Sequence, residues 1–554
     1  MIITPSPAAT SRRRLVFVAA NLAVYLALLA TLHAALGPGW VSALLTLLAA
    51  IFAPWSVLSL TTGIIGAWQL FAGPPRPPAS NAAIVQRTAI VMTIRNEDPA
   101  RALKRLRIVQ ESLDASGWGD MFGFHVLSDT SDPEIAAAEE EAIAAWPGGR
   151  VAYRRRHDNT GFKAGNVMAF CQSHLGQYEC MITLDADSLM TAQAILPLVR
   201  LMQENADFGL IQGLVVGLPA ANLFTRAFQF GMRHGMRGYT VGQAWWTLDC
   251  GPFWGHNAII RMQPFAAHCG LPVLDGAPPF GGHILSHDQV EATLMRRAGY
   301  QVRLQVIAGG SYEDNPPTIL DYIGRDLRWC QGNLQYLRLL DLPGLKPVSR
   351  FQLVWAILMF IGIPAWLIAV ALLPVSGWAI TTAHPAWLPW LSAAFLFMQL
   401  CPKLVGYAHS LALAPRARRY GGRARLLLGA LFEIGFNLMQ NSITSYPVTF
   451  FILGLLQGRA TRWGAQPRDA RRVTWAEAAA ALWPQTLFGL WLHGGMALWC
   501  PALLPWALPW TIGYLLAIPF AVLTADAGIS AWFRGHGLLT TPEERAPPPE
   551  VAAL

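Results

Sequence analysis

Long apolar runs on both sides of a charged central region constrain the fold more than any other feature of this sequence. Residues 15–36 and 41–72 form two such runs, and further runs follow residue 350. A helix of about 20 apolar residues spans the hydrocarbon core of a bilayer. Only 13% of the 554 residues are charged, whereas about a quarter is usual in soluble proteins. The sequence therefore predicts a membrane protein with one hydrophilic domain inserted between transmembrane helices.

Basic residues predict the orientation of these helices, because cytoplasmic loops are enriched in Lys and Arg. Arg12, Arg13 and Arg14 precede the first run and favour a cytoplasmic N-terminus. Two crossings then return the chain to the cytoplasm, so residues 1–78 are predicted to form an N-terminal pair of transmembrane helices. The net charge of +8 fits basic cytoplasmic loops. The chain has no nucleic-acid-binding motif, so a nucleic-acid partner is not expected.

Residues 351–535 are predicted to form a C-terminal transmembrane bundle. Full crossings are predicted at 351–374, 388–411, 482–500 and 505–533. The segment 426–456 lies between two basic stretches and contains polar residues, which favours an interfacial helix or a re-entrant pair with no net crossing. The basic loop 457–480 and the short tail 536–554 are then cytosolic. The total is six crossings, and eight is the alternative.

The central region, residues 79–350, alternates short apolar runs with helical patterns. Strands are predicted at 88–94, 122–127 and 180–184, each followed by a helix. Such alternation predicts an α/β domain with a mostly parallel, Rossmann-like sheet covered by helices. Ligands of these sheets bind at the carboxyl ends of the strands. The acidic motifs of this chain lie at those ends.

Two carboxylates follow the third predicted strand. Asp185 and Asp187 are two residues apart, where they can share a divalent cation that neutralises a diphosphate leaving group. An Asp-x-Asp pair alone is a weak signal, because chance surface charges give the same pattern. The position after a buried strand favours the metal site.

Polar side chains also follow the first two strands. Asp129 ends the second strand, where it can contact a base or a ribose or help to hold the metal. Thr93, Arg95 and Glu97 follow the first strand and can bind a nucleotide. The alternative for these three is a capping turn for the helix after Asp98.

Two further motifs carry candidate charges. Lys163 lies in the Gly-rich turn 159–166, which allows the backbone and a cation to approach phosphates. Asp288 precedes an amphipathic helix and can serve as the base that accepts a proton from a hydroxyl nucleophile. The alternative for Asp288 is an ordinary helix cap.

An arginine-aromatic motif approaches the membrane. Arg325 and Arg328 are three residues apart, so they are predicted to share a helix face. Arginine can bind a diphosphate through two parallel hydrogen bonds, and Trp329 offers a flat surface on which a sugar can stack. The alternative is a juxtamembrane anchor of Arg and Trp.

Five of these motifs occur along the chain in a familiar order: Asp129, the turn with Lys163, Asp185-x-Asp187, Asp288 and Arg328-Trp329. Together they resemble the motifs of the processive family-2 glycosyltransferases of the GT-A type, the relatives of cellulose synthase. The likeness covers about residues 85–340. Cellulose synthases carry Thr-Glu-Asp in place of Ser286-His287-Asp288, and Gln-x-x-Arg-Trp in place of Arg325-x-x-Arg328-Trp329. The variants in this chain, with Ser311-Tyr312-Glu313, resemble the osmoregulated periplasmic glucan glucosyltransferases.

The resemblance implies a hexosyltransferase that uses UDP-glucose and builds a β-1,2-linked glucan backbone for the periplasm. It implies that Asp129 and residues 93–97 hold uridine and that Lys163 lies near the nucleotide. Asp185 and Asp187 would serve the diphosphate and Mg²⁺ or Mn²⁺, with Asp187 as the more direct ligand.

The same resemblance assigns the remaining roles. Asp288 would be the base of a single inverting displacement. Pyrophosphate and the acceptor end would be bound by Arg325, Arg328 and Trp329, and a looser match adds Trp254 and His256 as acceptor-site residues. The basic loop near 466–475 lies where relatives carry a mobile loop over the donor.

The implied place of action is the bacterial inner membrane, with the catalytic domain and both termini in the cytoplasm. The expected partners are UDP-glucose, the growing glucan and membrane lipid, with an acyl carrier protein or periplasmic glucan-processing proteins as further candidates. Three alternatives stay open: a synthase of cellulose or another β-glucan, a non-processive enzyme that makes a glycolipid, and a transporter with a regulatory domain.

Overall fold

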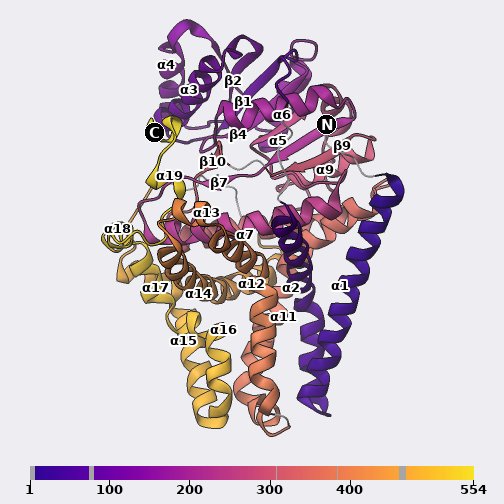
Figure 1. The fold of residues 1–554 in the computed structure, drawn as a ribbon, viewed down its shortest axis with the longest axis vertical. Helices are drawn as coiled ribbons and strands as arrows, with labels where there is room; N and C mark the ends of the chain where they lie inside the picture. Colours follow the sequence, from indigo (N-terminus) through magenta and orange to yellow (C-terminus); the bar gives the residue numbers. More distant parts are fainter. Residues whose placement is uncertain (1–5, 74–79, 307–308, 384, 461–468) are drawn as a thin grey trace.

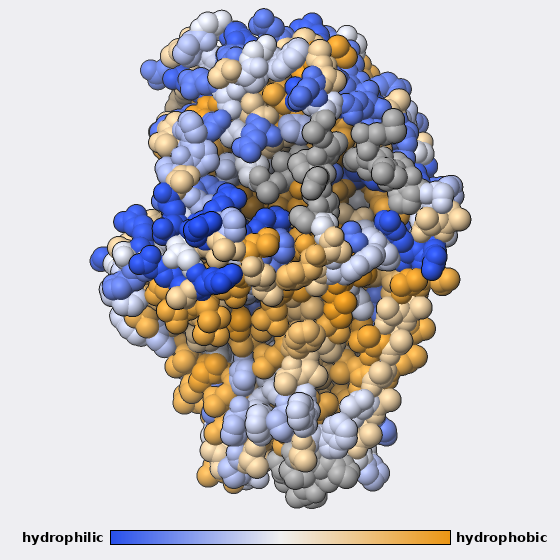
Figure 2. Space-filling view, in the orientation of Figure 1, coloured by the Kyte–Doolittle hydropathy of each residue, from blue (hydrophilic) through white to orange (hydrophobic). Residues whose placement is uncertain are grey.

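A sheet domain rests on a bundle of long helices in the computed structural model (Figure 1). The structure describes residues 6–73, 80–306, 309–383, 385–460 and 469–554. Apolar residues gather in a band below the sheet domain, as expected for surface that faces lipid (Figure 2).

The sheet domain contains a seven-stranded, mostly parallel sheet. Its strands are β1 (Thr88–Ile94), β2 (Phe122–Ser128), β3 (Val151–Arg155), β4 (Cys180–Asp185), β6 (Phe208–Gly213), β8 (Ala258–Arg261) and β9 (Gln301–Gln305). They lie in the order β3-β2-β1-β4-β8-β6-β9, and only β8 runs antiparallel to its neighbours. The predicted α/β class and mostly parallel sheet are confirmed.

The central strand explains why this sheet forms. Residues 89–92 of β1 are fully buried, as expected for a parallel strand covered by helices on both faces. The helices of the domain are α3 (Pro99–Ala115), α4 (Pro133–Ala144), α5 (Phe162–Ser173), α6 (Ala192–Glu204), α8 (Met262–His268), α9 (Asp288–Arg297) and α10 (Ile319–Leu334).

Strand register sets the position of the acidic motifs. Thr93 lies opposite Asp185 in the pairing of β1 with β4. On the other side of β1, the amide of Asp129 donates to the carbonyl of Ile94 at 3.0 Å. The ends of three neighbouring strands therefore place these carboxylates at one edge of the sheet.

A second, three-stranded sheet lies beside this edge. It consists of β5 (Leu189–Met190), β7 (Val216–Gly217) and β10 (Ser311–Glu313), in the order β5-β10-β7. The antiparallel pairing of β10 with β5 places Tyr312 opposite Leu189. This pairing brings a late segment of the chain against the residues that follow Asp187.

Five described helices are long and apolar enough to cross a membrane, or six when one bent pair counts as a span. The five are α1 (Pro7–Leu36), α2 (Trp40–Ala72), the Pro347–Gly377 part of α11 (Pro347–Ala383), α12 (Leu388–Ala412) and α14 (Arg423–Leu456). The bent pair joins residues 501–515 to α17 (Ala517–Thr524) at 64°. The chain is therefore a membrane protein.

Two of the predicted segments take a different form in the structure. The region 426–456 lies within the single helix α14, so it does not form the predicted re-entrant pair, and this helix is long and apolar enough to be a span. The predicted crossing at 482–500 lies in α15 (Trp475–Trp499), which is not among the five helices. The remaining helices of this part are α13 (Ala414–Arg419), α16 (Leu504–Leu515) and α18 (Ala527–Gly535).

Helix α7 (Leu223–Thr247) runs across the molecule between the sheet domain and the long helices (Figure 1). Its backbone touches that of α2, because a Cβ atom on Gly242 would lie 2.0 Å from the carbonyl oxygen of Thr62. A Cβ atom on Gly66 of α2 would likewise lie 2.0 Å from the carbonyl oxygen of Gly238. Only glycine permits so close an approach of two helices.

The C-terminal residues fold back onto the sheet domain. Helices α19 (Pro542–Arg545) and α20 (Pro549–Ala552) follow α18. Glu544 pairs with the buried Arg226 of α7 at 2.7 Å, and Glu543 pairs with Arg233 at 2.6 Å. Val551 joins the core of the sheet domain. The segment predicted as a tail therefore ties α7 to this domain.

The glycine contact gives a first testable prediction. We expect Gly242→Ala to lower stability by about 1–3 kcal/mol, the usual cost of overpacking. The control is Gly435→Ala in α14, where an added Cβ would meet nothing within 4 Å. There alanine should be neutral or stabilising, because it favours the helix by up to about 1 kcal/mol. Thermal unfolding of the detergent-purified protein measures both, and equal midpoints would contradict the contact.

Candidate active site

One cavity of about 960 Å³ contains nearly all of the candidate residues. Its wall begins at the carboxyl ends of β1, β2 and β4 and continues along α7 to the long helices α2, α11, α12 and α14. The predicted residues that line it are Thr93, Arg95, Glu97, Asp129, Lys163, Asp185, Asp187, Trp254, His256, Asp288, Arg325 and Trp329. Arg328 is the one predicted residue that is not part of this wall.

The carboxylate of Asp185 lies next to a lysine. The ammonium of Lys163 donates to Asp185 and, at 2.9 Å, to the carbonyl of Gly255. The Thr93 hydroxyl lies 3.4 Å from the same carboxylate oxygen of Asp185. Lys163 is the second residue of α5. The N-terminal end of this helix therefore lies at the strand ends. This part of the cavity combines a fixed cation with the carboxylate of a predicted metal site.

Asp129 is held by partners that sequence reasoning did not assign to it. Its carboxylate accepts two hydrogen bonds of 2.8 Å from the guanidinium of Arg156 and one of 2.8 Å from the amide of Asn166. Arg156 directly follows β3, the strand beside β2. The run of three arginines at 154–156 after a predicted helix was the available signal for this partner.

The turn after β1 provides the helix cap considered for it, and the same turn also lines the cavity. Asp98 caps α3 through a 3.0 Å hydrogen bond from the amide of Ala100. Asn96 has a left-handed backbone with φ of 52°, and its side chain accepts from the amides of Ser131 and Asp132. Arg95 and Glu97 therefore face the cavity from a turn that is fixed to the end of β2.

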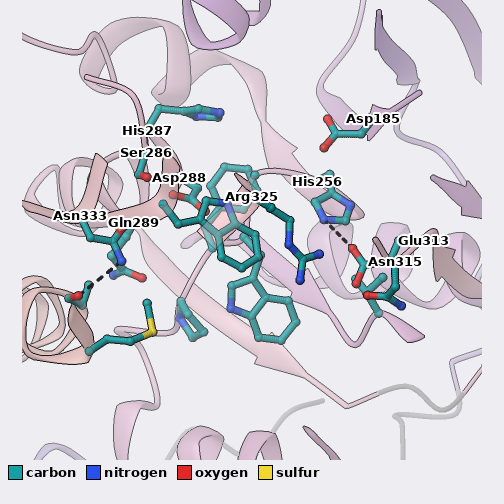
Figure 3. A pocket seen from close by; sticks show the side chains of 18 of the residues that line it. Asp185, His256, Ser286, His287, Asp288, Gln289, Glu313, Asn315, Arg325 and Asn333 are labelled. Carbon is teal, nitrogen blue, oxygen red and sulfur yellow. Dashed lines mark hydrogen bonds and ion pairs between the residues drawn. The ribbon is translucent and has the colours of Figure 1, made fainter. Parts of the chain in front are cut away.

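His256 forms an ion pair inside the cavity (Figure 3). Its Nε2 lies 3.3 Å from a carboxylate oxygen of Glu313, and its Nδ1 lies 3.2 Å from the Ser188 hydroxyl. Burial alone would lower the pKa of His256, but the hydrogen bond to Glu313 and the charge of Asp185 together raise it above its ordinary value. Glu313 was quoted in the sequence only as part of a motif.

Asp288 is the first residue of α9 and lines the cavity. The residue at the cap position is His287, and its side chain makes no capping hydrogen bond. Its Nδ1 lies instead 2.8 Å from the carboxylate of Glu291. Burial lowers the pKa of His287, but the charge of Glu291 and its hydrogen bond together raise that pKa above its ordinary value. The carboxylate of Asp288 therefore does not serve as the helix cap.

Helix α10 presents one face to the cavity. This face consists of Tyr322, Arg325, Trp329, Asn333 and, in the turn that follows, Tyr336. The Arg325 guanidinium lies 4.5 Å from the ring centre of Trp329, and no described carboxylate forms an ion pair with it. In Figure 3 it points toward the His256–Glu313 pair. A half-buried cation that faces the cavity in this way suits an anionic ligand.

Comparisons with known proteins assign this arrangement to a family. A family model for glycosyl transferase family 2 matches residues 89–268, and one for glycosyl transferase family group 2 matches residues 180–400. Glucans biosynthesis glucosyltransferase H of Xanthomonas campestris pv. campestris (strain B100) is 36% identical, covering 98% of this chain and 89% of that protein. The protein of the same name from Shewanella sp. (strain ANA-3) is 36% identical, covering 92% of this chain and 74% of that protein. The chain belongs to the glucans biosynthesis glucosyltransferase H family.

Membership of the glucosyltransferase H family makes the chain a family-2 glucosyltransferase of glucan synthesis. Its sheet domain is accordingly a GT-A-type catalytic domain between membrane helices. Among solved structures, a mannosyltransferase from Pyrobaculum calidifontis in complex with GDP-Man and Mn²⁺ is 15% identical with a TM-score of 0.42, and the match covers 65% of this chain and 98% of that one.

The residues of the predicted metal site suit a metal ion that takes its other ligands from the substrate. Within the described ranges, no group of three or more His, Cys, Asp or Glu side chains is placed to hold a metal ion. Asp185 and Asp187 supply two carboxylates at one strand end. Mg²⁺ is commonly held by one or two carboxylates, with water and substrate phosphates as its other ligands. The donor set therefore fits Mg²⁺ or Mn²⁺ bound together with a diphosphate.

The His287–Glu291 pair predicts a pH dependence of stability in the glucosyltransferase. The pKa of His287 in the folded protein lies above its ordinary value of 6.5. The pair therefore stabilises the fold fully below about pH 6.5, and this contribution is lost as the pH rises through the raised pKa. We expect Glu291→Gln to flatten this loss in unfolding midpoints measured from pH 6 upward. The exposed His157→Gln is the control, and an unchanged slope in Glu291→Gln would contradict the pairing.

Proposed function

We propose that this glucosyltransferase transfers glucose from UDP-glucose to a growing β-1,2-glucan and exports the chain across the inner membrane. The observation that carries the proposal is the single cavity, whose wall includes both the charged strand ends and uncharged polar side chains of the membrane helices. Donor chemistry and a path for a neutral polymer would share this space.

The strand-end part of the cavity suits a nucleoside diphosphate. Asp129 and the 93–97 turn would contact the uridine, and Lys163 and Arg325 would face the two phosphates. A bound Mg²⁺ or Mn²⁺ would neutralise the diphosphate as it leaves. Asp185 and Asp187 would hold that ion from the strand end. Fixed charges of this kind stabilise a leaving group without reorganising during the reaction.

Asp288 would act as the base of a single displacement. An acceptor hydroxyl loses its proton to the Asp288 carboxylate while its oxygen forms the new bond to the glucose C1. The bond from C1 to the diphosphate oxygen breaks at the same time, and UDP leaves. Attack from the face opposite the leaving group inverts C1 from the α configuration of the donor to β. Trp329 and Trp254 offer aromatic surfaces for the acceptor sugar.

The membrane part of the cavity suits an uncharged glucan. Carboxamide side chains line it from α7 and three long helices: Gln243 of α7, Gln352 of α11, Gln399 of α12, and Asn437, Gln440 and Asn441 of α14. Gln289 of α9 and Asn333 of α10, two helices of the sheet domain, line the same cavity. Amides donate and accept hydrogen bonds, so they can replace water around sugar hydroxyls without adding charge. Polar side chains in membrane helices commonly mark a substrate path. This wall supports a polymer product over a glycolipid.

The proposed orientation places the catalytic domain and both termini in the cytoplasm, where UDP-sugars are made. Arg14 of α1 supports it, because its guanidinium donates to the carbonyl of Thr247 at the end of α7, at 2.7 Å. The N-terminus therefore lies on the side of the sheet domain. Within this arrangement we place α14 (Arg423–Leu456) at the interface with no net crossing, since basic residues flank both of its ends. The predicted donor-covering loop near 466–475 falls partly outside the described residues, which resume at residue 469.

Substitution of the two proposed catalytic carboxylates tests the reaction. We expect Asp288→Asn to lower glucosyl transfer by about 10²–10⁴-fold, the usual contribution of a general base, and Asp187→Asn to raise the requirement for Mg²⁺. The measurement uses purified protein, labelled UDP-glucose and Mg²⁺, followed by linkage analysis of the product. The exposed Asp275→Asn is the matched control. Full activity of Asp288→Asn would refute its role, and use of another donor in place of UDP-glucose would refute the proposed function.

The amide wall predicts an effect on product length. We expect Asn441→Trp to shorten the glucan, because a large ring would narrow the path beyond the catalytic residues. UDP release per protein should change less than chain length. Leu431→Trp on the outward, 59% exposed side of the same helix is the control. Products of equal length in both variants would exclude this wall as the polymer path.

A further inference from the structure

Two adjacent acidic residues of the β10 segment are connected to the Asp185–Ser188 motif. Glu313 and Asp314 both line the cavity, yet neither was assigned a role from the sequence. The pairing of β10 with β5 places them beside the residues that follow the motif. Each acid connects to the motif through one basic side chain.

The first connection passes through Arg105 of α3. One guanidinium nitrogen of Arg105 donates to the backbone carbonyl of Asp187, and the other pairs with the Asp314 carboxylate at 2.7 Å. Arg101, one helical turn earlier, pairs with the same carboxylate at 2.5 Å. Arg105 is 4% exposed, so solvent screens this contact little. The planar guanidinium thus fixes the peptide that carries the carboxylate of Asp187.

The second connection passes through His256. Glu313 pairs with its Nε2, and its Nδ1 lies against the hydroxyl of Ser188. That hydroxyl accepts a 3.1 Å hydrogen bond from the amide of Asp185. The two connections therefore end on different residues of the motif, one on each carboxylate-bearing residue.

Stability alone does not explain a buried arginine at this position. Burying an ion pair costs several kcal/mol of desolvation, and well-packed apolar residues often replace such a pair without loss of stability. An apolar side chain on α3 would also leave the carbonyl of Asp187 without this donor. Removal of a residue that orients a metal ligand typically lowers metal affinity or activity by about 10–100-fold.

We propose that Arg105, Asp314 and Glu313 are positioning residues that orient Asp187 and Asp185 toward the metal and the diphosphate. This inference rests on the proposed function of that motif. None of the three needs to touch the reacting atoms. Their loss would therefore weaken binding of the metal–donor complex more than it slows the transfer step.

The conservative substitution Arg105→Lys tests the first connection. Lysine keeps the charge beside Asp314 but cannot donate to two acceptors in the fork geometry of arginine. We expect the Mg²⁺ concentration for half-maximal activity, or the donor KM, to rise about tenfold, with kcat within about twofold. The matched control is Arg150→Lys, because Arg150 forms a two-hydrogen-bond pair with Asp114 of the same helix α3 but lies 38% exposed.

The second connection gives an independent variant. Glu313→Gln should raise the same constant, because it removes the charge that pairs with His256. If Arg105→Lys fails to unfold cooperatively, Asp314→Asn carries the first test. Values equal to those of Arg150→Lys, or a loss confined to kcat, would overturn the proposal. The ratio between variants can be measured with whichever nucleotide sugar the wild type consumes, so failure of UDP-glucose as donor would be distinguished from failure of this inference.

Discussion

The close approach of α7 to α2 is the contact on which the rest of the arrangement depends. Helices usually pack with their axes about 8–10 Å apart, because side chains separate them. Here Gly66 and Gly242 remove those side chains, and the backbones touch. Gly406 of α12 extends the same contact, since its Cβ would lie 2.0 Å from the carbonyl oxygen of His234. The sheet domain is therefore seated directly on the membrane helices, which lets one cavity cross the boundary between them.

Charge is distributed unevenly along that cavity. The end of the cavity at the sheet combines the Lys163–Asp185 pair with the guanidinium of Arg325, whereas the amide wall between α7 and α14 carries mostly neutral polar groups. A diphosphate would be held at the charged end, because moving it toward the membrane helices would cost it these partners. A neutral glucan has no such restriction. The separation of charged and neutral surface is thus consistent with retaining the nucleotide while the product moves away.

Local patterns in the sequence predicted the parts of this structure that depend on neighbouring residues. The strand at 88–94 and the carboxylates that follow the predicted strands were found because apolar runs and turn residues carry strong local signals. Helical spacing placed Arg325 and Arg328 on one face, yet the cavity follows the spacing of Arg325 and Trp329 and leaves Arg328 aside. Contacts between distant segments had no such signal. The Asp129–Arg156 pair spans 27 residues and the Arg105–Asp314 pair 209, so only the folded chain reveals them.

A buried carboxylate in α14 links distant segments among the long helices in the same way. Glu433 is 1% exposed, and an isolated charge that is so deeply buried would be costly. Lys403 of α12 pairs with it, and the Tyr407 hydroxyl donates to it at 2.6 Å. Gly231 of α7 lets the carboxylate approach, since a Cβ atom there would lie 1.9 Å from Glu433. The satisfied charge therefore joins three helices that all contribute to the cavity wall, and it fixes the amide side chains of α14 relative to α7.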